Sequence, residues 1–171
     1  MSTVGEFFRP VPLLRLGGET YHKRIEADAA ERSALARRFA LVTLDRLVAE
    51  VELVREPHGT ILLSAVFEAA FEQECIVTLE PIAGRVAERF QLRYGPPEAE
   101  DEVPSGDDDP AFEPLVSDEI DIGEAVAQEF SLLLPPFPRF PDAVVEGDGE
   151  PSPEEDGPFA ALEKFRRSEP Q

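Results

Sequence analysis

The chain has 171 residues and a formal net charge of −20, with 42% apolar residues, 17 prolines and a single cysteine. This length accommodates one domain with one core. A single cysteine excludes an intrachain disulfide and a zinc site built from several cysteines, and it is typical of a reducing compartment. No apolar run approaches the ~20 residues of a membrane span, and no signal peptide is visible, so we expect a soluble cytoplasmic protein.

Charge divides the chain into two parts. Residues 1–93 contain 14 acidic and 12 basic side chains, whereas residues 94–171 contain 22 acidic and 4 basic ones, with no Lys or Arg between Arg93 and Arg139. Such an acidic segment is expected to be solvated and extended. It can be a solubilising linker or a docking surface for a basic partner protein. The candidate partner-binding acids are Glu98, Glu100, Asp101, Glu102, Asp107, Asp108 and Asp109.

The first elements are short. Residues 7–16 include Pro10 and Pro12 and predict an irregular edge strand, because proline cannot donate to a ladder. After Gly17-Gly18, residues 20–26 predict a returning strand. Asp28 followed by Glu31 forms a capping-box pattern that predicts a helix over 28–39. Its predicted apolar face comprises Ala30, Ala34, Leu35, Phe39 and Val42.

Three runs with period two follow, at 47–54, 61–72 and 86–94, with a turn at 57–59 between the first two. Alternation with short turns and no intervening helix favours an antiparallel arrangement over βαβ units. We therefore predict an α+β fold. It consists of an antiparallel β-meander or a small, partly open barrel covered by one main helix, with short C-terminal helices and acidic linkers.

The remainder of the chain is richer in proline and acid. We predict an acidic disordered insertion at 95–117, then a helix that Asp121 caps and that runs through Phe130 before Pro135-Pro136. Residues 146–171 predict an acidic linker and a short helix over 158–167 with Phe159, Leu162 and Phe165 at helical spacing. The predicted organisation is one domain over 1–145, followed by the 146–171 tail.

Residues that could carry chemistry are few and separated. His22 and His58 have neither Cys75 nor a carboxylate at a spacing that builds a triad or a metal site. No phosphate-binding glycine loop is present, and Asp107-Asp108-Asp109 lacks the spacing of a calcium loop. Cys75 is interpreted as a small, half-buried apolar residue. The sequence therefore predicts no enzyme, no cofactor and no metal site.

Basic residues do not form one stripe on the predicted helix. Arg38 falls within its apolar arc, whereas Arg37 and Arg32 lie outside opposite borders, which favours ion pairing over nucleic-acid recognition. A direct RNA contact would have to use Arg37, Arg38, Arg89 and Arg93, together with Lys23 and Arg24.

Three segments resemble the YceD family, the proteins associated with large ribosomal subunit RNA accumulation. They are residues 73–81 (QECIVTLEP), residues 119–135 (EIDIGEAVAQEFSLLLP) with Pro138, and residues 158–166 (PFAALEKFR). The acidic spacer between the first two is also similar in position and character, so the resemblance spans about 8–167. The signature positions are Cys75, Pro81, Asp121, Glu129 and Pro135.

The resemblance implies a non-enzymatic role in the synthesis, processing or stability of large-subunit (23S) ribosomal RNA. Many relatives carry a C-x-x-C pair that looks like part of a metal site, but here Cys75 is followed by Thr78 at the second position. No metal role is therefore transferred. We expect a partner on the large-subunit precursor or a basic ribosomal protein, and no membrane. The alternative is an escort that binds one basic ribosomal protein stoichiometrically.

Overall fold

A computed structural model describes residues 5–102, 106 and 109–144. The chain divides into two units, residues 1–139 and 140–171. The predicted helix over 158–167 lies outside the described residues. Of the second unit only residues 140–144 are described, and they form a turn in which the N–H of Ala143 donates to the carbonyl oxygen of Phe140 at 3.1 Å.

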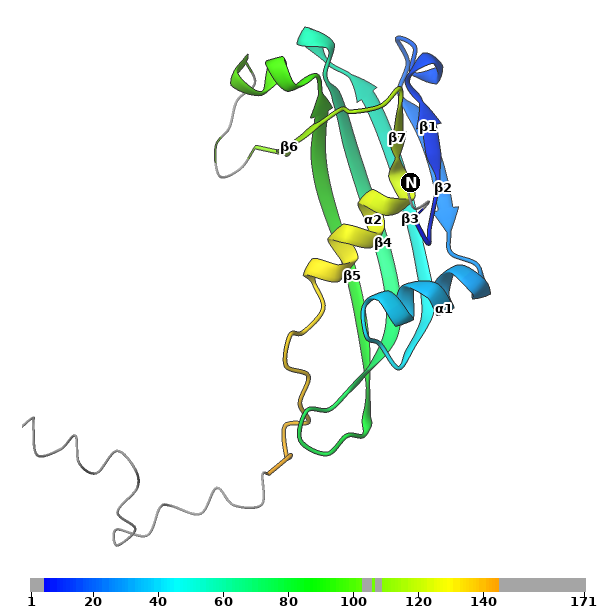
Figure 1. Ribbon diagram of the computed structural model, residues 1–171, viewed down its shortest axis with the longest axis vertical. Helices are drawn as coiled ribbons and strands as arrows, with labels where there is room; N and C mark the ends of the chain where they lie inside the picture. Colours follow the sequence, from blue (N-terminus) through cyan, green and yellow to red (C-terminus); the bar gives the residue numbers. More distant parts are fainter. Residues whose placement is uncertain (1–4, 103–105, 107–108, 145–171) are drawn as a thin grey trace, which may run out of the picture. The chain divides into compact units, whose positions relative to one another are not determined.

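The first unit is built on a five-stranded sheet with the order β2-β3-β4-β5-β6 (Figure 1). Its strands are β2 (Tyr21–Glu26), β3 (Thr43–Arg55), β4 (Ile61–Glu74), β5 (Pro81–Gly95) and β6 (Ala111–Pro114). The first four pair antiparallel as a meander, whereas β6 pairs parallel to β5. The predicted α+β fold with an antiparallel meander is confirmed, and the sheet does not close into a barrel.

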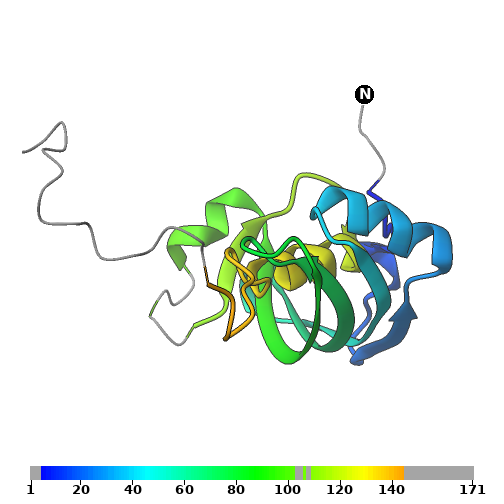
Figure 2. The same ribbon diagram turned by 90° about the horizontal axis from the view of Figure 1, so that it is seen from below.

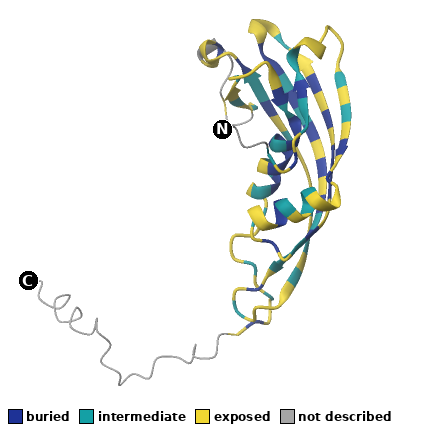
Figure 3. Ribbon diagram, turned by 45° about the vertical axis from the view of Figure 1, so that its right-hand side comes forward, coloured by how far each residue is buried: buried dark blue, intermediate teal, exposed yellow. Residues whose placement is uncertain are grey.

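Alternation along the strands gives the sheet one buried and one open face, as Figure 3 shows. We call the buried one the inner face. Its central strand contributes Ile61, Leu63, Ala65, Phe67 and Phe71, none of them more than 3% exposed. The outer face carries Glu and Arg side chains at the intervening positions. This pattern is expected where only one face of an antiparallel sheet packs on a core.

Two helices cover the inner face. α1 (Ala29–Arg38) begins at the predicted capping box, in which the Asp28 carboxylate accepts from the N–H of Glu31 at 2.9 Å and the Glu31 carboxylate accepts from the N–H of Asp28 at 2.8 Å. α2 (Ile122–Leu132) lies across the concave face, and the sheet curves around it (Figure 2). Within α2, Phe130 is fully buried and meets the rings of Phe39 and Phe71 edge-on, with centroid distances of 5.8 and 5.5 Å.

A second, two-stranded sheet leads into α2. It pairs β1 (Pro10–Pro12) with β7 (Glu119–Asp121) antiparallel. The described residues of this unit also form three 3₁₀ turns: η1 (Leu13–Arg15), η2 (Pro57–Gly59) and η3 (Pro97–Glu102). No helix within the described residues is long and apolar enough to cross a membrane.

The structure differs from the sequence prediction at three places. β5 begins at Pro81 rather than at residue 86, and β6 and η3 lie within the 95–117 segment that was predicted to be disordered. Val42 is 49% exposed, although it was assigned to the apolar face of α1. The reason is that α1 ends at Arg38 and Ala40 adopts a positive φ of 54°, so Val42 is no longer on the helix.

The packing at the start of α2 leaves no room for a side chain at Gly123. A Cβ on Gly123 would lie 1.7 Å from the carbonyl oxygen of Phe7. Gly123→Ala should therefore push α2 from the N-terminal segment and lower the free energy of unfolding by about 3 kcal/mol, measured by urea denaturation. Gly17→Ala is the matched control, because nothing lies within 4 Å of its Cβ, and it should change stability by less than about 0.5 kcal/mol. Equal effects of the two substitutions would contradict the close packing at Gly123.

Candidate functional site

Two segments of the first unit that are far apart in sequence meet at the end of the β4–β5 hairpin. The N–H of Ile76 donates to the carbonyl oxygen of Pro138 at 2.9 Å, and the side-chain amide of Gln73 donates to the carbonyl oxygen of Pro135 at 3.2 Å. Each segment contains signature residues: Cys75 lies in the hairpin loop, Pro81 begins β5 directly after it, and Pro135 lies in the chain after α2. The fold thus brings together two segments that the sequence singled out separately.

A groove of about 460 Å³ lies at this junction, and we call it the signature groove. It is lined mainly by apolar groups, including Phe39, Ile76, Leu134, Pro135 and Pro138. Two further large apolar side chains of the same segments are mostly exposed, Leu79 at 67% and Phe137 at 75%, and Ile76 itself is 53% exposed. Apolar surface gathered in this way is typical of a protein-interaction site.

Cys75 supports the shape of the hairpin loop. It is fully buried, rather than half-buried as expected, and its Sγ accepts from the N–H of Thr78 at 3.4 Å. Its carbonyl oxygen accepts from Leu79, whose φ of 61° is uncommon for a residue with a side chain. The sulfur and the carbonyl oxygen of Cys75 thus accept from two successive residues of the loop, Thr78 and Leu79.

The donor set at this loop does not fit a metal ion. A structural zinc site needs four Cys or His ligands, whereas Thr78 occupies the second position of the C-x-x-C spacing. Among the described residues, no group of three or more His, Cys, Asp or Glu side chains could hold an ion.

Asp121 anchors the other end of α2. Its Oδ1 accepts from the N–H groups of Gly123 at 3.1 Å and Glu124 at 3.2 Å, as the predicted cap, and also from the N–H of Arg9 at 2.8 Å. One carboxylate thereby joins the helix start to the N-terminal segment. This signature residue has a structural role that explains its position.

Arg38 links α1 to α2. Its guanidinium donates to both carboxylate oxygens of Glu124 at 2.8 and 2.6 Å and to Glu6 at 3.0 Å, and it lies 5.2 Å from the ring centroid of Phe39. The hydrogen bonds from Arg38 lower the pKa of Glu124, and those to Glu124 raise the pKa of Arg38. Arg38 thus pairs with two carboxylates, Glu6 and Glu124, that come from other segments of the chain.

Glu129 is the remaining signature position on α2. It is partly buried, and burial followed by the nearby Glu113 carboxylate raises the pKa of Glu129. Burial is also the main cause that raises the pKa of Tyr94, with Glu113 second. The carboxylate of Glu129 therefore lies in an unfavourable environment for its charge, in contrast to Glu124.

The four candidate RNA-contacting arginines do not form one surface. Arg37 and Arg38 lie on α1, and Arg37 donates to Ser33 Oγ at 3.0 Å. Arg93 lies on the outer face of β5, donates to Glu56 at 2.9 Å and has a side chain only 11% exposed. Arg89 is the only one of the four that is exposed and makes no side-chain contact among the hydrogen bonds and ion pairs of the described residues.

The structure describes five of the seven candidate partner-binding acids. Glu98, Glu100, Asp101 and Glu102 lie in η3, where Glu98 and Glu100 are exposed on either side of Ala99, which is 4% exposed and anchors the turn. Asp109 is exposed, and Asp107 and Asp108 lie outside the described residues.

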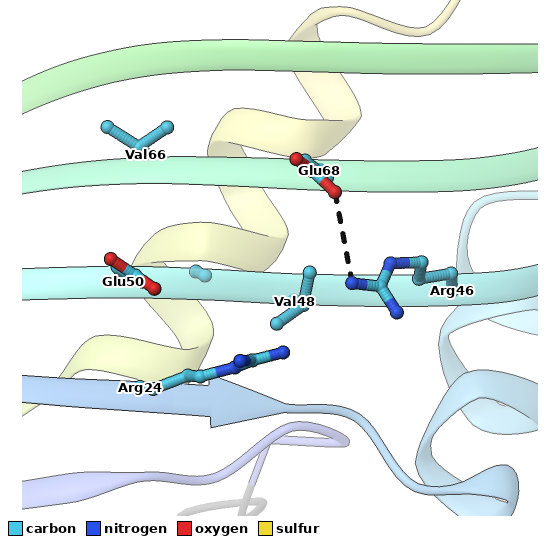
Figure 4. Close-up of a pocket in the computed structure, with 7 residues that line it drawn as sticks. Arg24, Arg46, Val48, Glu50, Val66 and Glu68 are labelled. Carbon is cyan, nitrogen blue, oxygen red and sulfur yellow. Dashed lines mark ion pairs between the residues drawn. The ribbon is translucent and has the colours of Figure 1, made fainter.

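A charged hollow on the outer face was not predicted from the sequence. It measures about 400 Å³ and is lined by Arg24, Arg46, Val48, Glu50, Val66 and Glu68 (Figure 4). Arg46 and Glu68 approach to 3.8 Å, and Arg24 lies 3.8 Å from Glu26, which is not among the lining residues. With two arginines and two glutamates, the lining has no net formal charge. Alternation predicts that these residues share a face, but strand register decides which ones become neighbours.

The family described as large ribosomal RNA subunit accumulation protein YceD matches over residues 63–166. No curated protein and no solved structure matches the chain significantly. The matched region contains the hairpin loop, the acidic segment and α2, and so includes both segments that form the signature groove.

The Arg38–Glu124 pair should make stability depend on pH. Because the folded-state pKa of Glu124 is lowered, its stabilisation is complete above the unfolded pKa of about 4.3 and is lost as the pH falls through the folded value. Glu124→Gln should lower the free energy of unfolding by about 1 kcal/mol at neutral pH, and the difference from wild type should shrink in acid. Chemical denaturation across a pH series measures both. Glu119→Gln, an exposed carboxylate change, is the control, and a pH-independent loss at Glu124 would contradict the ion pair.

Proposed function

The chain belongs to the YceD family, and on that premise we propose that it is a non-enzymatic factor that supports the synthesis, processing or stability of 23S ribosomal RNA in the cytoplasm. The observation that carries the proposal is the family match over residues 63–166. That match covers the two segments that meet in the signature groove, so the region shared with the family includes the exposed apolar side chains Ile76, Leu79 and Phe137.

We further propose that contact with the large-subunit precursor is made mainly through protein. RNA phosphates are bound by clustered, available cations. Here Arg38 and Arg93 are already paired with carboxylates, and the other two candidates lie on different elements. The signature groove instead offers apolar side chains that can be buried against a protein partner.

The non-enzymatic part of the proposal has support from the candidate nucleophile and bases. Cys75 is fully buried, whereas the side chain of His22 is 63% exposed and lies 3.2 Å from Glu52 on the outer face. A general base must come within hydrogen-bond reach of the group that it activates, but His22 lies on β2 and Cys75 lies in the loop after β4.

Co-sedimentation with large-subunit precursor particles tests the proposal. Ile76→Asp places a charge at the signature groove and should reduce association by about tenfold or more. Val116→Asp is the matched control, because Val116 is 91% exposed and lies outside the groove, and it should bind as wild type. Association should also resist salt better than phosphate contacts, which lose roughly 10³–10⁵ in affinity between low and moderate salt. A wild-type protein that never sediments with precursors would refute the assembly role.

A second candidate function is an escort for one basic ribosomal protein, favoured by the concentration of acid in residues 94–171. Changing Glu98, Glu100, Asp101, Glu102, Asp107, Asp108 and Asp109 to their amides keeps the chain length while it removes the charge. If the protein is an escort, this variant should lose about tenfold or more of its affinity for that partner in the absence of RNA. Calorimetric titration with purified basic large-subunit proteins measures this. Unchanged affinity would exclude the acidic segment as the binding surface.

A further inference from the structure

β5 has a long open edge. It pairs with β4 along its whole length from Pro81 to Gly95, but on its other side β6 pairs only with Leu92–Gly95. Among the strands that the structure describes, none pairs with the remaining part of that side (Figure 1). An unpaired strand edge presents a row of N–H and C=O groups that can template another strand.

The hydrogen bonds identify which backbone groups face outward. Cys75 donates to the carbonyl oxygen of Glu80 at 2.8 Å, so in this antiparallel ladder the even-numbered residues of β5 bond to β4. Consistently, Gly95 accepts from Leu115, which follows β6, and the N–H of Arg89 donates not to β4 but to the Glu88 carboxylate at 3.2 Å. The odd-numbered residues from residue 83 to residue 89 therefore direct both groups away from the sheet.

These outward groups are almost all available. Within the described part of the chain, the backbone groups of Ala83, Arg85, Ala87 and Arg89 on that side have one hydrogen-bond partner, the Glu88 carboxylate. Glu88 is itself exposed and belongs to the same strand, so a docking strand could displace it without unfolding anything.

Two arginine side chains, Arg85 and Arg89, lie along the same edge. Arg85 and Arg89 are exposed on the outer face, opposite Ala70 and Val66 of β4, and neither forms an ion pair with a described residue. The other arginines of that face, Arg24, Arg46 and Arg93, each lie within 4.0 Å of a carboxylate. On the inner side the edge shows Val86, Glu88 and Phe90. Val86 and Phe90 are half-buried against the core, whereas Glu88 between them is exposed.

The charges disfavour a second copy of the chain as the occupant. An antiparallel self-pair centred on Ala87 would place Arg85 directly opposite Arg89 twice, and one centred on Glu88 would place that carboxylate opposite itself. A self-pair centred on Val86 would place the arginines opposite Ala83 and Ala87, so neither would gain a carboxylate partner. Like charges directly opposite one another destabilise a strand pair. An acidic strand would instead pair favourably with both arginines.

We propose that the edge of β5 from Ala83 to Arg89 is a docking site for an extended acidic segment of a partner protein, which adds to the sheet as a further strand. Its carboxylates, four residues apart, would face Arg85 and Arg89, and its intervening apolar side chains would cover Val86 and Phe90. The site is distinct from the signature groove, and the inference does not depend on the proposed role in ribosomal RNA accumulation.

A blocked synthetic peptide, Ser-Glu-Val-Thr-Val-Glu-Val-Ser, is the probe, titrated into the full-length protein with binding followed by amide chemical shifts. Shifts should be confined to β5 from residue 83 to residue 91. Arg85→Glu with Arg89→Glu should weaken binding by about tenfold or more and should favour the peptide in which both glutamates are lysine. Arg24→Glu with Arg46→Glu makes the same charge change elsewhere on the outer face and should leave binding unchanged.

Ala87→Pro separates strand addition from simple ion pairing. It removes an outward N–H without removing a bond to β4, so the fold should persist, as circular dichroism can verify, while peptide binding is lost. No detectable binding to the wild type, equal binding by the Arg85 and Arg89 variant, or full binding by Ala87→Pro would overturn the proposal. So would an edge that binds single-stranded RNA in preference to the acidic peptide.

Discussion

Phe130 occupies the position on which the rest of the first unit depends. Its ring is fully buried against Phe39, which caps α1, and Phe71, which lies near the end of β4. A curved sheet cannot bury its own concave face, and α2 supplies the missing apolar side. Burial of one phenylalanine contributes about 2 kcal/mol or more, and truncating it to alanine in a core costs about 3–5 kcal/mol.

Because the Phe130 ring fixes the position of α2, it also fixes the position of the chain that leaves this helix towards the hairpin loop. The signature groove is thus a consequence of the same packing that closes the core.

The parts that could be predicted from the sequence are those in which one local signal suffices. Period-two alternation identifies β3 and β4 because one face of each strand is exposed to solvent. The N-cap residues Asp28 and Asp121 locate the starts of α1 and α2. Tertiary contacts decide the remainder. The strand predicted from residue 86 begins at Pro81, and Gly84 lies within it opposite Phe71, where a Cβ would lie 2.6 Å from the Phe71 ring. β6 has four residues and an acidic, proline-containing sequence, so only its pairing with β5 reveals it as a strand.

The same limit applies to the candidate site. The signature residues were found as separate segments, but their spatial convergence depends on where α2 ends relative to the β4–β5 hairpin. Three signature residues have structural roles. The buried sulfur of Cys75 accepts a hydrogen bond within the hairpin loop, Asp121 caps α2, and the carbonyl oxygen of Pro135 accepts from Gln73. The arginines likewise divide into those that pair with carboxylates and those that do not. Arg24, Arg38 and Arg93 looked available for RNA but pair with carboxylates. Arg89 instead remains, together with Arg85, at a strand edge that no local pattern reveals.

The parallel direction of β6 limits which insertions and deletions the segment before it can tolerate. Strands that run parallel must be joined by a connection that returns along the full length of the pair, and such a crossover usually takes a dozen or more residues. The acidic segment between Gly95 and Ala111 is that connection. Its composition can drift and it can accept insertions at little entropic cost, but it cannot be shortened greatly without detaching β6. Length, rather than the identity of any one acid, is what topology constrains in this segment.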